Sequence, residues 1–124
     1  MANPQFSCTV LAQVLSEQTN PEQGVYAFSY TITIENTGDI TAQVIGRHWT
    51  ITDARGYEQE VHGLALVGHQ PLLAPGQKFQ YSSWAQIATP QGAMSGRLLC
   101  ATEEAEVFYS PVAEFMLADT SSLH

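Results

Sequence analysis

The chain has 124 residues, of which 44% are hydrophobic and 13% charged, and its formal net charge is −8. This length suits one domain with its own core and is too short for two domains of ordinary size. With only four Lys and Arg residues in the chain, the charge argues against nucleic acid as a partner, because phosphate contacts need clustered cations.

The chain begins with no basic segment, and no apolar run is long enough for a signal peptide or a membrane span. We therefore expect a cytoplasmic protein with no membrane partner. Cys8 and Cys100 lie near opposite ends of the chain. A secreted sandwich could join two strands with such a pair, but in the cytoplasm we expect two reduced cysteines that pack as small apolar residues.

Alternation of apolar and polar residues recurs along the chain, whereas helical periodicity is hard to find. In chain order, strands are predicted at residues 6–15, 25–35, 40–52, 57–62, 77–84, 93–101 and 107–117. Turn-forming residues separate them, including Asp53–Gly56, where the Asp53 side chain is expected to cap the turn. About seven or eight strands with such turns predict an all-β, immunoglobulin-like sandwich of antiparallel strands. One domain is expected over residues 1–124, with its core over 6–118 and a flexible tail at 119–124.

Within the strand at 40–52, alternation places Arg47 on the face predicted to line the core and His48 on the opposite face. The core face also carries Ile45, Trp49 and Ile51, and the face of His48 carries Val44 and Thr50. A buried guanidinium needs partners. Arg47 is therefore either an anion-binding group at the base of a pocket, or a structural group bonded to loop carbonyls or an acidic neighbour, or turned outward by a bulge.

Three residues with metal-binding side chains, Glu58, Glu60 and His62, share one face of the strand at 57–62. Their carboxylates and imidazole are candidate ligands for a divalent ion. Side chains on one strand face are spaced nearly 7 Å apart, because a strand rises about 3.3 Å per residue. A metal would therefore need a ligand from another segment. An exposed polar strand face explains the same residues.

Trp84 falls on the opposite strand face from Phe79 and Tyr81, which predicts an exposed Trp. Such a residue is a candidate contact with a protein partner or with a second copy of the chain. Candidate catalytic groups are few. The sequence places no serine in a nucleophile elbow and suggests no triad. We expect a protein that is not an enzyme.

Several motifs follow one another in the middle of the chain: Arg47–Asp53, Glu60–Gly63, Val67–Pro71, Leu73–Gly76, Phe79–Tyr81, Thr89–Gly92 and Met94–Gly96. In order and spacing they resemble the ApaG family of small bacterial proteins, over about residues 6–118. The resemblance implies a fibronectin type III-like sandwich with no established catalytic activity. It also implies a link to cobalt and magnesium resistance and to diadenosine tetraphosphate hydrolase, by genetics and operon context. Eukaryotic copies of the domain are presumed to bind partners.

The family is noted for a Gly-x-Gly-x-x-Gly segment, and residues 63–68 depart from it because Ala65 replaces the middle glycine. No helical pattern follows, so the segment does not predict a dinucleotide-binding site. Two hypotheses remain: a non-catalytic interaction module, or a small-ligand sensor for a divalent metal or a phosphorylated nucleotide. No cofactor is expected. The candidate ligand-binding residues are Arg47, His48, Gly63, Gly68, His69 and Gln70.

Overall fold

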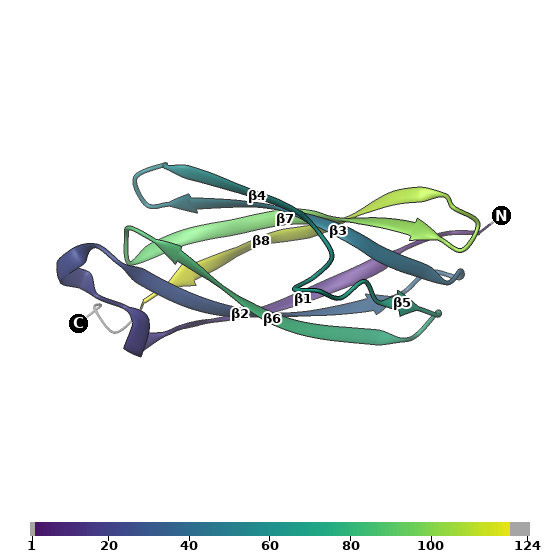
Figure 1. The fold of residues 1–124 in the computed structure, drawn as a ribbon, viewed down its shortest axis with the longest axis horizontal. Coiled ribbons are helices and arrows are strands. Elements are labelled where there is room, and N and C mark those ends of the chain that lie inside the picture. Colours follow the sequence, from purple (N-terminus) through teal and green to yellow (C-terminus); the bar gives the residue numbers. More distant parts are fainter. Residues whose placement is uncertain (1, 120–124) are drawn as a thin grey trace.

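The structure, a computed structural model, describes residues 2–119, and eight β-strands make up most of them (Figure 1). The strands are β1 (Phe6–Val14), β2 (Tyr26–Asn36), β3 (Ala42–Asp53), β4 (Glu58–Leu64), β5 (Leu72–Leu73), β6 (Lys78–Ile87), β7 (Gln91–Thr102) and β8 (Val107–Ala118). Two single-turn 3₁₀ helices, η1 (Ser16–Gln18) and η2 (Pro21–Gln23), connect β1 to β2. No helix among the described residues is long and apolar enough to cross a membrane.

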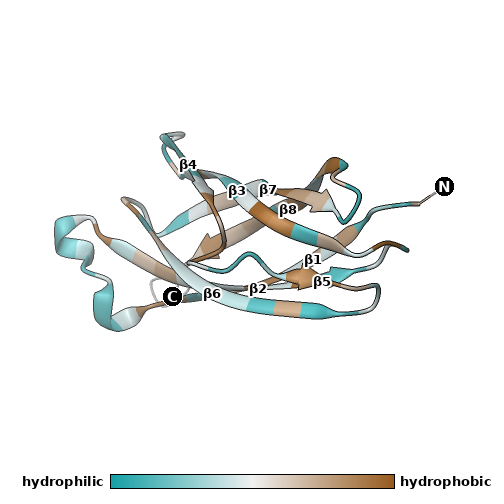
Figure 2. Ribbon diagram, turned by 45° about the vertical axis from the view of Figure 1, so that its right-hand side comes forward, coloured by the Kyte–Doolittle hydropathy of each residue, from teal (hydrophilic) through white to brown (hydrophobic). Residues whose placement is uncertain are grey.

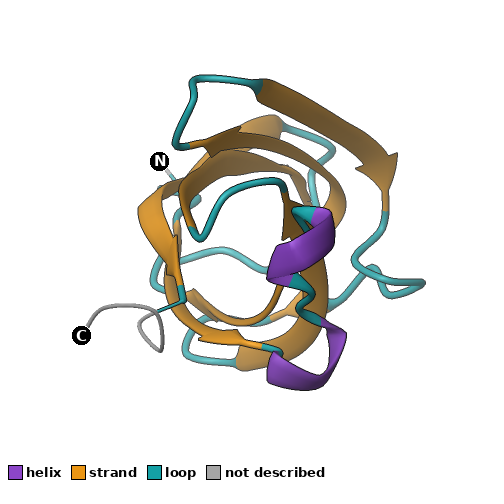
Figure 3. Cartoon of the chain, turned by 90° about the vertical axis from the view of Figure 1, so that its left-hand side faces the viewer, coloured by secondary structure: helices purple, strands orange, loops and turns teal. Residues whose placement is uncertain are grey.

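The strands form two antiparallel sheets that pack face to face. A three-stranded sheet has the order β1-β2-β6, and a five-stranded sheet has the order β4-β3-β7-β8, with the short β5 pairing with β3. Seen from one end, the two layers enclose a common interior, and both 3₁₀ helices lie at that end (Figure 3). The predicted all-β sandwich of antiparallel strands is confirmed.

The core lies between the sheets because every second residue along each strand points to the inner face, and most of these residues are apolar. In β2, Phe28, Ile32 and Ile34 are fully buried, and hydrophobic residues alternate with polar ones along several strands in Figure 2. Trp49 of β3 packs edge-on against Tyr30 of β2, with 6.0 Å between ring centroids. Contacts of this kind hold the five-stranded sheet on the three-stranded one.

A β-bulge in β3 changes which residues face the core. The register between β3 and β7 shifts between Val44 and Gly46, so Ile45 is the extra residue. Trp49 and Ile51 face the core as predicted, but Val44 is also fully buried. The prediction that Val44 shares the outer face of His48 is therefore wrong, because simple alternation does not survive a bulge.

The turn between β3 and β4 is built as the sequence predicts. Asp53 Oδ1 accepts hydrogen bonds from the backbone N–H groups of Arg55 and Tyr57, and Gly56 has a φ of 86°. Other strand boundaries differ from the predicted ones by a few residues, and β5 lies between the predicted strands at 57–62 and 77–84. Asp119, the first residue of the predicted tail, is buried. The rest of that tail, residues 120–124, lies outside the described residues.

Candidate functional site

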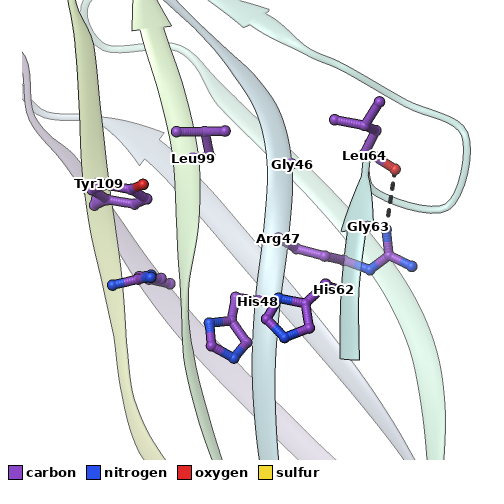
Figure 4. Close-up of a pocket in the computed structure, with 9 residues that line it drawn as sticks. Gly46, Arg47, His48, His62, Gly63, Leu64, Leu99 and Tyr109 are labelled. Atoms are coloured by element: carbon purple, nitrogen blue, oxygen red, sulfur yellow. Dashed lines mark hydrogen bonds between the residues drawn. The ribbon is translucent and has the colours of Figure 1, made fainter. Parts of the chain in front are cut away.

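A hollow of about 380 Å³ lies on the outer face of the five-stranded sheet, away from the core (Figure 4). Its lining comes from four neighbouring strands, β4, β3, β7 and β8. The lining residues are Gly46, Arg47, His48, His62, Gly63, Leu64, Arg97, Leu99 and Tyr109.

The hollow exists because one row of residues across the sheet has a glycine at its centre. In this row Gly46 pairs with Leu64 of β4 and with Leu99 of β7, and Leu99 pairs with Tyr109 of β8. A Cβ atom at Gly46 would lie 2.8 Å from the carbonyl oxygen of Gly63, so a glycine is needed for β3 and β4 to approach. The floor is left without a side chain between apolar walls.

The next row across the sheet is polar. His48 pairs with His62 of β4 and with Arg97 of β7. The Arg97 guanidinium lies over the Tyr109 ring, 4.5 Å from its centroid, a cation–π contact that orients the charge at the rim of the hollow. The hollow therefore combines a glycine floor and apolar walls with a basic rim, in a protein whose net charge is −8.

The side chain of Arg47 extends from the inner face of β3, and its guanidinium makes structural hydrogen bonds. Its Nη1 donates to the carbonyl oxygens of Leu64, at 3.2 Å, and Ala65, at 2.6 Å. Burial raises the pKa of Tyr81 far above its usual range, and the positive charge of Arg47 offsets part of that rise. The interpretation of Arg47 as a group bonded to loop carbonyls is confirmed.

The loop after β4 returns to the β-bulge rather than to the hollow. The carbonyl oxygen of Ile45, the bulged residue, accepts hydrogen bonds from the Ala65 N–H and from Gln70 Nε2. His69 packs against Phe79 of β6, with 5.6 Å between ring centroids. Of the candidate ligand-binding residues, Arg47, His48 and Gly63 therefore line the hollow, whereas Gly68, His69 and Gln70 are not among its lining residues.

Three residues of the segment at 63–68 have a left-handed backbone, namely Ala65, Val67 and Gly68. Ala65 has a φ of 69°, and Gly68 has a φ of 87°. These values lie in the left-handed region, which glycine adopts without steric cost. A glycine at the position of Ala65 is thus explained by the turn, with no phosphate required. Gly63 is small for another reason, because a Cβ there would lie 2.8 Å from Arg47 Nη1.

A group of three ionisable side chains lies at the border of the hollow on the outer face of β3 and β4, and its two histidines also line the hollow. Ligand atoms of His48, Glu60 and His62 all lie within 4.8 Å of one another. The two imidazole rings stack with 4.0 Å between centroids. Among residues 2–119, this is the one group of three His, Cys, Asp or Glu that meets in this way, and it does not include Glu58.

Sequence reasoning found two members of this group and missed how the third joins them. Glu60 and His62 share a strand face, as predicted, and His48 adds a side chain from another segment, β3. The pairing of β3 with β4 places His48 directly opposite His62. Arg97 and Tyr109 were missed as lining residues. Their outward alternation is visible in the sequence, but only the register of β3, β7 and β8 brings them to Gly46.

The predicted exposure of Trp84 is confirmed, since 64% of the residue is accessible. It lies on the outer face of the three-stranded sheet, opposite Ser29. A shallow hollow of about 500 Å³ adjoins it, lined also by Leu15 and Gln18. This surface belongs to the other sheet from the Gly46 hollow.

The two cysteines are free thiols on packed strands. Burial raises the pKa of Cys100 to about 12, and the nearby Cys8 adds to the rise. The pKa of Cys8 is also raised, mainly by burial, although its contact with the Ser110 hydroxyl lowers it. Neither thiol is activated, because nucleophilic cysteines have lowered pKa values.

Comparisons with known proteins agree with the motif pattern. A family model described as the ApaG domain matches residues 16–102. Protein ApaG of Ralstonia nicotianae is 49% identical over 124 residues, covering all of both chains. Protein ApaG of an Acidovorax species is 50% identical over 91% of this chain and 82% of its own. The crystal structure of a putative ApaA protein from Bordetella pertussis superposes with a TM-score of 0.90 at 47% identity, over 93% of this chain and 94% of that one.

Proposed function

Because the chain belongs to the ApaG domain family, we propose that it is a non-catalytic binding module whose binding surface is the outer face of the five-stranded sheet. The observation that carries this proposal is the hollow over Gly46. A glycine floor, two exposed apolar side chains, Leu64 and Tyr109, and the basic Arg97 meet there. In a chain of net charge −8, such a surface suits a protein partner that places an apolar side chain over Gly46 and a carboxylate against Arg97.

The chemistry of the remaining groups supports binding rather than catalysis. The thiols of Cys8 and Cys100 have raised pKa values, which makes them poor nucleophiles at neutral pH. The guanidinium of Arg47 is bonded to loop carbonyls. Free thiols also suit a reducing compartment, so a cytoplasmic location is part of this proposal.

Site-specific photocrosslinking tests the binding surface. A photoreactive amino acid is placed at Leu64, which is 74% exposed beside the hollow, or at Tyr57, which is 66% exposed in the turn that joins β3 to β4. In cells that naturally express the chain, we expect one discrete adduct from the Leu64 variant and none from the Tyr57 variant. The adduct should disappear when Arg97→Glu is added. Equal labelling from both positions, or an adduct indifferent to Arg97→Glu, would exclude this surface.

The mass of the adduct identifies the kind of partner. A product of twice the chain mass identifies a second copy of the chain, and any other mass identifies a different protein. Trp84 is a second candidate contact residue, on the three-stranded sheet. A second copy of the chain could bind there while a different protein binds the five-stranded sheet.

A small-ligand sensor is the second candidate function, and the side chains around the hollow favour it. A phosphorylated nucleotide would find one outward-facing guanidinium there, that of Arg97, with the Tyr109 ring beneath it. A divalent cation would find the group formed by His48, Glu60 and His62. The cation form is the one that would connect this chain to the cobalt and magnesium homeostasis implied by the family resemblance.

A further inference from the structure

We infer that His48, Glu60 and His62 form a binding site for a zinc ion at the ladder between β3 and β4. This inference rests on the cation form of the second candidate function, and it specifies the donor atoms and the class of metal. It does not depend on a protein partner at the Gly46 hollow.

The distances between the donor atoms fit a shared metal better than they fit hydrogen bonds. His48 Nε2 lies 3.6 Å from Glu60 Oε1, and His62 Nε2 lies 3.8 Å from Glu60 Oε2. Both distances exceed the usual range of a hydrogen bond, about 2.7–3.2 Å. Tetrahedral zinc with ligand bonds of about 2.0–2.1 Å holds its ligand atoms about 3.3 Å apart. The three donors, whose ligand atoms lie within 4.8 Å of one another, would have to approach by a fraction of an ångström to about 1.5 Å to reach that spacing.

The sheet supplies one firmly placed ligand and two adjustable ones. His48 lies on β3, which is paired on both sides by β4 and β7, and only 27% of its side chain is exposed. The side chains of Glu60 and His62 are 58% and 65% exposed, on a strand at the end of the sheet. They can swing outward to admit an ion and close on it afterwards. A fixed ligand with two mobile ones gives both a defined geometry and an entry path.

In the metal-free protein, one ring nitrogen of His48 is left without a hydrogen-bond partner. Its Nε2 is buried and has no hydrogen-bond partner. A metal ion would give this nitrogen a partner, because the imidazoles of His48 and His62, stacked with 4.0 Å between centroids, could both direct a ring nitrogen at one cation. The Glu60 carboxylate would offset one of the two positive charges of zinc.

The donor set selects the kind of ion. Two imidazoles and one carboxylate suit zinc and neighbouring transition ions, whereas magnesium and calcium prefer oxygen donors alone. Three protein ligands leave a fourth tetrahedral position open. Arg97, which pairs with His48 on the other side of β3, favours a negatively charged or neutral oxygen ligand there.

Isothermal titration calorimetry of the full chain with ZnCl₂ tests the site. We expect one zinc ion per chain. Each of His48→Gln, Glu60→Gln and His62→Gln should weaken binding at least about tenfold, since even outer-shell changes cost about 10- to 100-fold. The matched control is His69→Gln, which removes a histidine that packs against Phe79 outside the group and should leave zinc affinity unchanged.

Three results would overturn the inference: no binding heat up to millimolar zinc, the same loss of affinity in His69→Gln as in His62→Gln, or displacement of zinc by equimolar magnesium. His62 is exposed, so His62→Gln stays informative even if His48→Gln fails to fold. Failure here is distinguishable from failure of the binding-surface proposal, because Glu60 belongs to the metal group but does not line the Gly46 hollow. Crosslinking from Leu64 in the Glu60→Gln background therefore reports on the partner without the metal.

Discussion

The guanidinium of Arg47 lies against the backbone of Gly63, the residue directly opposite it on β4. A Cβ atom at Gly63 would come within 2.8 Å of Arg47 Nη1. The missing side chain makes room for the guanidinium to reach the carbonyl oxygens of Leu64 and Ala65. Residues 47 and 63 thus act as a pair that fixes the start of the loop after β4.

The substitution Gly63→Ala should therefore displace Arg47 without unfolding the protein. The atom in the way is the end of a flexible side chain, so the guanidinium can move and lose its two bonds to the loop. We expect a loss of about 1–2 kcal/mol in the free energy of unfolding, the usual value of hydrogen bonds to a charged group. Urea unfolding measures the loss, and amide hydrogen exchange should show faster opening of residues 65–69.

The comparison that makes this test specific is Gly96→Ala in β7. A Cβ there would overlap the backbone carbonyl of His48 and approach the Trp49 ring, and backbone cannot move aside as a side chain can. We expect a loss of more than about 3 kcal/mol, in the range reserved for severe steric changes. Equal losses for the two variants would show that Arg47 is as rigid as the strands.

The substitution Ala65→Gly should stabilise the protein. Ala65 has a φ of 69°, and this left-handed conformation costs a residue with a Cβ about 1–2 kcal/mol. Glycine removes that cost but adds freedom to the unfolded chain, which returns about 0.4–1 kcal/mol. A net gain of about 0.5–1 kcal/mol should appear in urea unfolding. The neighbouring Leu64→Gly, within β4, should instead lower stability, and a gain in both variants would contradict the explanation.

Stability should fall at alkaline pH in part because of Cys100. Burial raises the pKa of this thiol to about 12, whereas an unfolded cysteine ionises near pH 8.5. Below about pH 8.5 both states hold the proton, and the thiol's contribution is fully present. As the pH rises toward 12 the unfolded state gains by ionising first, so the contribution is lost at up to about 1.4 kcal/mol per pH unit.

Urea unfolding of wild type and Cys100→Ala between pH 8 and pH 11 measures this slope. The variant should be less stable at pH 8, because the substitution removes the buried sulfur atom. Its stability should also depend less on pH. A second measurement is alkylation by iodoacetamide at pH 8, where native Cys100 should react far more slowly than in urea-unfolded chain. Parallel slopes for the two proteins would refute the assignment to Cys100.

Trp84→Ser should change association and leave folding intact. The residue is 64% exposed and faces away from the core, so stability should stay within about 0.5 kcal/mol of wild type. If Trp84 forms a contact between copies, sedimentation equilibrium will show wild type heavier than the variant at equal concentration. Identical monomer masses would remove the contact between copies and leave Trp84 to a different partner.

The sequence predicts the fold well because period-two alternation and turn residues are local signals. The strand around Phe28 and Ile32 and the turn capped by Asp53 are both visible in short windows. The bulge at Ile45 is not, because it depends on how β3 pairs with β7. For that reason the sequence predicts the wrong face of the sheet for Val44 and the correct face for Trp49.

The candidate site depends on register even more strongly. Arg47 and His48 were singled out from one strand, and Glu60 and His62 from another. Nothing in the sequence states that residues 48 and 62 lie opposite each other, or that Arg97 and Tyr109 extend the same rows. The pairing of distant strands is set by the packing of the whole core, so no short stretch of the sequence predicts it.

Because β4 is an edge strand of its sheet, it affects whether two molecules of this protein associate. A terminal strand leaves backbone donors and acceptors on one side without a neighbouring strand, and these can recruit a strand from another molecule. Here Glu58, Gln59 and Glu60 are all exposed on that strand. Two copies pairing through β4 would bring four carboxylates together, so electrostatic repulsion opposes edge-to-edge association at this strand.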